Sequence, residues 1–92
     1  MIPREVNILG RPYKIRQKQM KDYGLCDYDN KYILIKTGMS TTQREETILH
    51  EVLHAILYES GIGFKFDTAT EEAVVRALEH GLYQAGFKRI TE

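Results

Sequence analysis

The spacing of apolar residues divides the chain into a first part that predicts strands and a second part that predicts helices. Apolar and polar residues alternate along residues 13–17, as in a strand with one buried face. Residues 5–9 predict an earlier strand, and the glycine and proline at 10–12 predict the turn between the two. Two β-prone runs, 25–28 and 32–36, flank a short polar turn and predict a hairpin.

Further along the chain, apolar residues recur at helical spacing in two blocks. The block at 40–60 predicts a helix that begins with a capping box at 40–43 and ends before Gly61. The block at 70–88 predicts a second helix, opened by another capping box at 68–71. The apolar stripe of this second helix consists of Val74, Val75, Leu78, Leu82 and Ala85.

Together these elements predict a single α+β domain over residues 1–92, with a small antiparallel sheet of three to four strands in 1–38 and two packed helices after it. Acidic and basic residues balance at 13 each, so no net field attracts nucleic acid or an anionic membrane. We find no apolar run of membrane-spanning length and no signal peptide. The single cysteine, Cys26, is expected to pack as a small hydrophobe, and it suits a cytoplasmic location.

One polar stripe interrupts the otherwise apolar surface of the first predicted helix. It contains the run His50-Glu51-Val52-Leu53-His54, which has the form His-Glu-x-x-His. Residues four apart lie on the same side of a helix, so both imidazoles can bind one divalent ion while the Glu51 carboxylate lies beside them. Buried polar groups need partners, and a zinc ion with a water molecule would satisfy all three side chains. The run therefore predicts the centre of a zinc peptidase.

Catalytic zinc needs a third protein ligand, with its fourth position left to water. His80 and the acids at the start of the second predicted helix, Glu71 and Glu72, are the candidates. Glu71 lies near the centre of the apolar stripe, so burial alone favours it as the ligand, whereas Glu72 lies towards the edge of the stripe. A helix start predicted from sequence can be off by one or two residues, so the pattern leaves the choice open. An alternative without metal also stays open, in which both histidines are core residues bonded to backbone carbonyls and Glu51 reaches solvent.

Four stretches of the chain resemble a known family, namely residues 26–30, 45–56, 72–75 and 81–84. They resemble the small gluzincin-type zinc metallopeptidases of bacteria and phages, which are related in plan to ImmA/IrrE and SprT-like proteins. The resemblance implies a zincin-like minimal metallopeptidase fold, with Glu72 as the third metal ligand beside His50 and His54. Members often carry an acid four residues further on that orients a ligating histidine, and this chain has Arg76 there.

These residues predict a zinc-dependent metalloendopeptidase, which hydrolyses peptide bonds with a metal-activated water and Glu51 as general base. Its partner is a protein or peptide substrate, and the resemblance places residues 32–36 at the sheet edge where an extended peptide could pair. Tyr58, His80 and Tyr83 are candidates for a further donor to the transition state. The alternative function is a catalytically silent, zinc-stabilised module that binds a protein, and a third is a metal-dependent hydrolase of a non-peptide bond.

Overall fold

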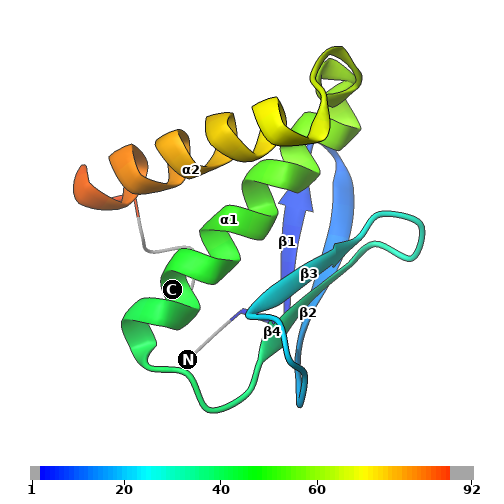
Figure 1. The fold of residues 1–92 in the computed structure, drawn as a ribbon. Coiled ribbons are helices and arrows are strands. Elements are labelled where there is room, and N and C mark those ends of the chain that lie inside the picture. The colour runs from blue at the N-terminus through cyan, green and yellow to red at the C-terminus, as the bar shows by residue number, and fades with distance from the viewer. Residues whose placement is uncertain (1–2, 88–92) are drawn as a thin grey trace.

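The computed structural model describes residues 3–87, which form a four-stranded sheet followed by two helices (Figure 1). The α+β fold class and the order of the elements are confirmed. The elements are β1 (Glu5–Ile8), β2 (Arg11–Lys18), β3 (Gly24–Asp27), β4 (Tyr32–Lys36), α1 (Thr41–Ser60), the short 3-10 helix η1 (Ile62–Lys65) and α2 (Thr68–Gln84). The second helix was expected to reach residue 88, which lies outside the described residues, but α2 already ends at Gln84.

The sheet is mixed, whereas we expected antiparallel pairing throughout. Its strand order is β1-β2-β4-β3, and β1 pairs with β2, and β3 with β4, in antiparallel fashion. The inner strands β2 and β4 are parallel, with Ile15 opposite Ile33. The chain leaves β2, runs back along β3 and returns as β4, so the hairpin joins the sheet through its second strand. β4 is therefore an inner strand and β3 an edge, which corrects the expectation that residues 32–36 form the edge.

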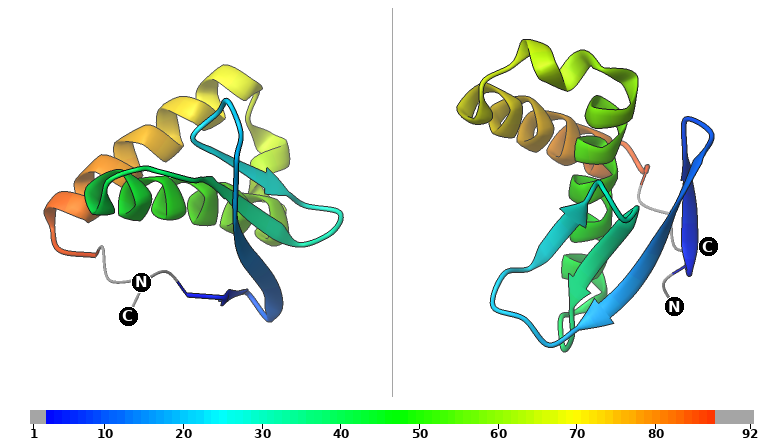
Figure 2. Two further views of the ribbon diagram at one scale, coloured as in Figure 1. Left: turned by 90° about the horizontal axis from the view of Figure 1, so that it is seen from below. Right: turned by 90° about the vertical axis from the view of Figure 1, so that its right-hand side faces the viewer.

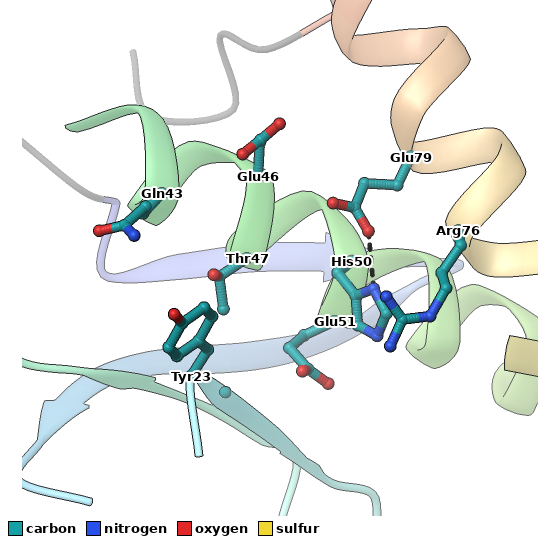
Figure 3. Close-up of a pocket in the computed structure, with 9 residues that line it drawn as sticks. Tyr23, Gln43, Glu46, Thr47, His50, Glu51, Arg76 and Glu79 are labelled. Atoms are coloured by element: carbon teal, nitrogen blue, oxygen red, sulfur yellow. Dashed lines mark hydrogen bonds and ion pairs between the residues drawn. The ribbon is translucent and has the colours of Figure 1, made fainter. Parts of the chain in front are cut away.

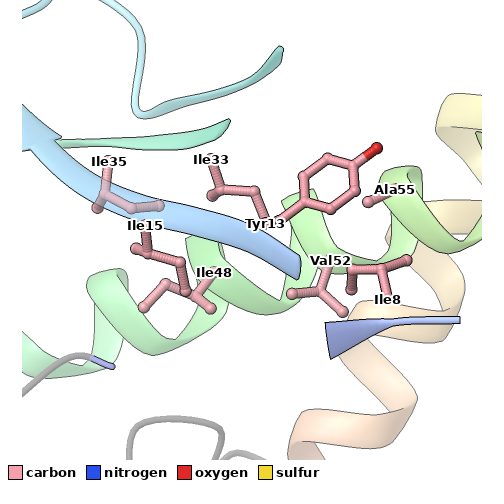
Figure 4. Packing of buried hydrophobic residues seen from close by; sticks show 8 residues of the cluster. All are labelled: Ile8, Tyr13, Ile15, Ile33, Ile35, Ile48, Val52 and Ala55. Carbon is pink, nitrogen blue, oxygen red and sulfur yellow. The ribbon is translucent and has the colours of Figure 1, made fainter. Parts of the chain in front are cut away.

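The main hydrophobic core lies between the sheet and one face of α1 (Figure 4). Alternate residues of β2 and β4 point to this face, and α1 contributes residues at helical spacing. Its buried members are Ile8, Tyr13, Ile15, Ile33, Ile35, Ile48, Val52 and Ala55. Because the core fixes α1 against the sheet, it also fixes the direction in which the polar stripe of α1 points.

A smaller cluster joins α2 to another face of α1. Leu49 and Leu53 of α1 and Val75 of α2 are buried in it. Within the described residues, α1 thus has the sheet on one side and α2 on the other (Figure 2). Leu78, which we expected in the apolar stripe of α2, is 44% exposed, so the buried part of that stripe is narrower than predicted.

The caps of α1 agree with the sequence, and two other local predictions were off by one or two residues. Ser40 and Gln43 form the predicted capping box, and Gly61 ends the helix in the left-handed conformation. The cap of α2 is Asp67, which accepts a hydrogen bond from the Thr70 N–H at 2.6 Å, in place of a box at 68–71. The first turn occupies Leu9 and Gly10, both with positive φ, so β2 already begins at Arg11.

Candidate metal centre

The two histidines of the motif project from the middle of α1 into the space between β3 and α2. Their ring centroids are 4.9 Å apart, as expected for positions one helical turn apart. Both side chains are largely buried, with 19% of His50 and 11% of His54 exposed. The sheet-facing and α2-facing apolar residues of α1 flank this stripe, so the rings can reach only this space.

Glu72, in the second turn of α2, faces the Nε2 atoms of both rings. Its Oε1 lies 2.7 Å from His54 Nε2, and its Oε2 lies 3.8 Å from His50 Nε2. One ligand atom from each of the three residues lies within 4.8 Å of the others. The structure therefore brings together the three residues that the sequence and the family resemblance selected as ligands.

The opposite nitrogen of each ring is held by a different glutamate of α2. His50 Nδ1 lies 2.7 Å from Glu79 Oε1 (Figure 3), and His54 Nδ1 lies 2.6 Å from Glu71 Oε2. A carboxylate at Nδ1 keeps the proton there, fixes the ring orientation and leaves the Nε2 lone pair for a metal. Glu71, left open as a ligand by the sequence pattern, thus lies behind His54 and supports it.

The donor set fits a zinc ion. A neutral imidazole donates from only one nitrogen, yet both nitrogens of His54 lie within hydrogen-bond distance of a carboxylate. Without a metal, the contact between His54 Nε2 and Glu72 needs an extra proton. A divalent cation accepts the lone pairs of Nε2 and of the Glu72 carboxylate together. Two imidazole nitrogens and one carboxylate, with room for water, are a ligand set used by catalytic zinc.

Glu51 directly follows His50 in α1 and lies under Gly24 of β3, and it is 8% exposed. Burial raises the pKa of Glu51 above its usual value, and the nearby His50 and His54 act in the opposite direction. A carboxylate with a raised pKa accepts a proton more readily. This is the property that a general base for water needs.

Gly24, the first residue of β3, allows the strand to approach α1 closely at this point. A Cβ atom there would lie 2.6 Å from Thr47 Cγ2 and 3.0 Å from Glu51 Oε2. Any larger residue would therefore push the edge strand away from Glu51. We did not single out Gly24 from the sequence, although a glycine next to a strand is a known sign of close approach.

Two adjoining hollows flank the motif and form one open cleft. The smaller hollow, about 350 Å³, extends towards the start of α1. Gln43 and Thr47 of α1 and Glu79 of α2 belong to its lining (Figure 3). The larger, about 590 Å³, extends towards the end of β3 and the start of α2. Both are lined by Gly24, His50, Glu51 and Arg76. The candidate metal ligands therefore lie along a cleft that continues in two directions.

A family model described as the IrrE N-terminal-like domain of the M78 peptidases matches residues 11–79. The matched stretch runs from β2 to Glu79. It contains His50, Glu51 and His54 of α1 and the three glutamates of α2 that contact the histidines. The chain belongs to this family. The match confirms the expected relation to IrrE-like peptidases, whereas the relation to SprT-like proteins stays a prediction. No curated protein and no solved structure matches the chain at a significant level.

Within this IrrE-like domain, none of the three expected transition-state donors lines either hollow. Tyr58 stacks against the ring of Tyr28, and His80 is exposed on α2. The Tyr83 hydroxyl donates to Glu45 Oε1 at 3.1 Å. Tyr28, which we did not consider from the sequence, does line the larger hollow.

Cys26 packs against the main core, and it does not belong to the metal-binding group found among the described residues. Burial raises the pKa of the Cys26 thiol to about 12, with a further contribution from the negative charge of Glu51. The thiol therefore stays protonated at neutral pH. This agrees with its expected packing role. None of the helices within residues 3–87 is both long and apolar enough to cross a membrane.

The sequence reading missed Glu79 as a partner of His50. The position at which the family often carries an orienting acid holds Arg76, whose side chain is 75% exposed and whose Nε lies 3.7 Å from Glu72 Oε2. Glu79 stands seven residues after Glu72, which is two helical turns, so it projects from the same side of α2. That spacing was the available signal, and Glu79 lies about one turn further along α2 than Arg76.

Proposed function

We propose that the protein is a zinc-dependent metalloendopeptidase. The observation that carries the proposal is the convergence of three ligand atoms beside a buried carboxylate. One ligand atom from each of His50, His54 and Glu72 lies within 4.8 Å of the others, and the neighbouring Glu51 has a raised pKa. Membership of a peptidase family supports this assignment.

His50, His54 and Glu72 would hold the zinc ion, and Glu71 and Glu79 keep both rings oriented for it. Zinc bound there would supply Lewis acidity, lowering the pKa of a water molecule and polarising the carbonyl of the bond to be cleaved.

Glu51 takes the proton from the attacking water and delivers it to the nitrogen of the departing amine. In this proposal Glu51, which follows His50 directly in α1, reaches a water molecule held by the two histidines and Glu72. Its burial keeps competing bulk water away from the carboxylate and favours the proton-accepting role.

The outer edge of β3 and the shape of the cleft favour a protein or peptide substrate in an extended conformation. β3 pairs only with β4 among the described strands, so the backbone groups of its other side are available. An extended peptide can add to such an edge through main-chain hydrogen bonds. The two hollows on either side of the metal-binding residues give it space for side chains before and after the cleaved bond.

The test begins with metal analysis of the purified protein. We expect about one zinc per chain in the wild type and in Glu51→Gln, and a large loss in Glu72→Ala. Both zinc-loaded forms are then incubated with a cell extract, and new protein N-termini are compared by mass spectrometry. N-termini that appear only with the wild type support the peptidase.

Two other results would contradict the proposal in different ways. Zinc binding without any new N-terminus would favour the catalytically silent binding module. A folded protein that binds no zinc would exclude both functions.

A further inference from the structure

The residue that follows β3, Tyr28, lies in the larger hollow together with the residues of the metal centre. It is half-buried and shares this lining with Glu51, His54 and Glu72. Its placement at the end of the edge strand puts an aromatic hydroxyl beside the path of a peptide bound along that strand.

The ring of Tyr28 is held by a stacked partner on α1. Its centroid lies 4.3 Å from that of Tyr58, and the two planes differ by 13°. Tyr58 follows His54 by four residues, so it projects from the same side of α1, one turn further along. The stack therefore places Tyr28 over the turn of helix next to His54.

The hairpin that carries Tyr28 is also anchored on both sides of the residue. Asp27 accepts hydrogen bonds from the backbone and the side-chain amide of Asn30, at 3.1 and 3.0 Å. Lys31 forms an ion pair with Glu59 of α1 at 2.7 Å. A side chain fixed by its backbone and by its neighbours loses little freedom when it binds a substrate, which is the requirement for a preorganised donor.

The chemistry of the proposed reaction leaves one requirement that Glu51 does not meet. Negative charge develops on the carbonyl oxygen of the attacked peptide bond, and a fixed donor aimed at that oxygen lowers the barrier. Arg76 also lines the larger hollow, but its side chain is 75% exposed and contacts Glu72. Burial, together with the nearby negative groups, raises the pKa of Tyr28, so its hydroxyl keeps its proton at neutral pH.

We propose that the Tyr28 hydroxyl donates a hydrogen bond to the carbonyl oxygen of the peptide bond under attack and stabilises the charge that develops there. The inference rests on the proposed peptidase function and adds a residue to it. No covalent bond to Tyr28 is formed, and its proton stays on the phenol oxygen throughout.

The test compares Tyr28→Phe with Tyr58→Phe in the zinc-loaded full chain. Each change removes one hydroxyl from the same stacked pair and keeps both rings. The probe is a phosphinic pseudo-tripeptide with alanine side chains, whose phosphinate oxygens resemble the tetrahedral state, and its affinity is measured by calorimetry. We expect about ten- to a hundredfold weaker binding for Tyr28→Phe, the usual effect of one hydrogen bond to a charged group. We expect wild-type affinity for Tyr58→Phe and unchanged zinc affinity for both.

The outcomes separate this proposal from the peptidase assignment. Equal probe affinity in Tyr28→Phe and the wild type, with zinc bound, would overturn the role of Tyr28 alone. A zinc-loaded wild type that does not bind the probe would also overturn it, because a site with this donor must recognise a tetrahedral anion. Failure of the wild type to bind zinc would instead overturn the proposed function.

Discussion

Two glutamates of α1, Glu51 and Glu59, are both shielded from solvent but have opposite electrostatic surroundings. Glu59 has 8% of its side chain exposed and meets Lys31 Nζ at 2.7 Å and the Tyr13 hydroxyl at 2.6 Å. These hydrogen bonds hold the pKa of Glu59 below its usual value. Glu51 lies under Gly24, and burial raises its pKa.

The contrast shows how one helix holds two shielded carboxylates whose pKa values are shifted in opposite directions. A carboxylate that is given donors and a cation stabilises the fold, but it has little tendency to take a proton. A buried carboxylate beside imidazoles costs stability, and it is ready to accept a proton from water. The two residues are about two turns apart on the same helix. The direction of each pKa shift therefore depends on what the sheet and its hairpin place beside the carboxylate, which is Lys31 and Tyr13 for Glu59 and Gly24 for Glu51.

The largest expected effect comes from Glu51→Gln. We expect hydrolysis of the substrates found with the wild type to fall by about 10²- to 10⁴-fold, the usual contribution of a general base. Zinc content should stay at one per chain, and the metal-free variant should resist urea at least as well as the wild type because a buried charge is gone. Glu59→Gln is the matched control, and it should retain turnover. Equal loss of activity in the two variants would remove the distinction between them.

Next in size are the effects of the acids of α2 on zinc affinity. We expect Glu72→Gln to lower it most, because a ligand is lost. Glu71→Gln and Glu79→Gln should each lower it by about ten- to a hundredfold, because each frees one imidazole ring to turn. Competition with a fluorescent zinc chelator measures all three. If Glu71→Gln had the largest effect, the assignment of Glu72 as the ligand would be wrong.

The close approach over Glu51 predicts a smaller loss of stability. Gly24→Ala places a methyl group 2.6 Å from Thr47 Cγ2, and such overpacking costs about 1–3 kcal/mol. Adding Thr47→Ser removes that methyl partner and should recover most of the loss relative to Thr47→Ser alone. Urea unfolding of the metal-free proteins measures this coupling, and strictly additive losses would show that the contact does not limit the packing.

The smallest effect concerns the pH dependence of Glu59. Its pKa in the fold is lower than in the unfolded chain, so its ionised form stabilises the protein above the ordinary glutamate value of about 4.5. This contribution disappears as the pH falls through the lowered value. We expect Glu59→Gln to unfold at less urea than the wild type at pH 7, and the gap to narrow below pH 4. Exposed Glu5→Gln should show no such gap at either pH.

Local signals in the sequence predicted the centre of the site and the ends of α1. His50, Glu51 and His54 belong to one helical segment, and the caps at Ser40 and Gly61 are formed by neighbours in the chain. Their geometry needs no contact with a distant segment. The helical spacing of apolar residues and the capping residues were therefore enough to predict it. The choice of Glu72 over Glu71 came from family resemblance, because both residues lie in one turn of α2.

The missed features all depend on contacts between distant segments. The parallel pairing of β2 and β4 places β3 at the edge, and no local pattern distinguishes this from a simple meander. Glu79 reaches His50 only because α2 crosses α1 at this angle. Tyr28 meets Tyr58 only because the hairpin folds back over the end of α1.

The attachment of α2 is small for a helix that carries three of the acids of the site. Val75 is its only buried residue within the described part of the chain, and Leu49 and Leu53 form the other side of that contact. Leu57, Leu82 and Tyr83 add partly buried apolar contacts, and the α2 glutamates add polar contacts with His50 and His54. An ion shared by His50, His54 and Glu72 would tie α2 to α1, so we expect metal binding to be coupled to the docking of α2. In hydrogen exchange, α2 should be the least protected long element without zinc and gain the most protection when zinc is added.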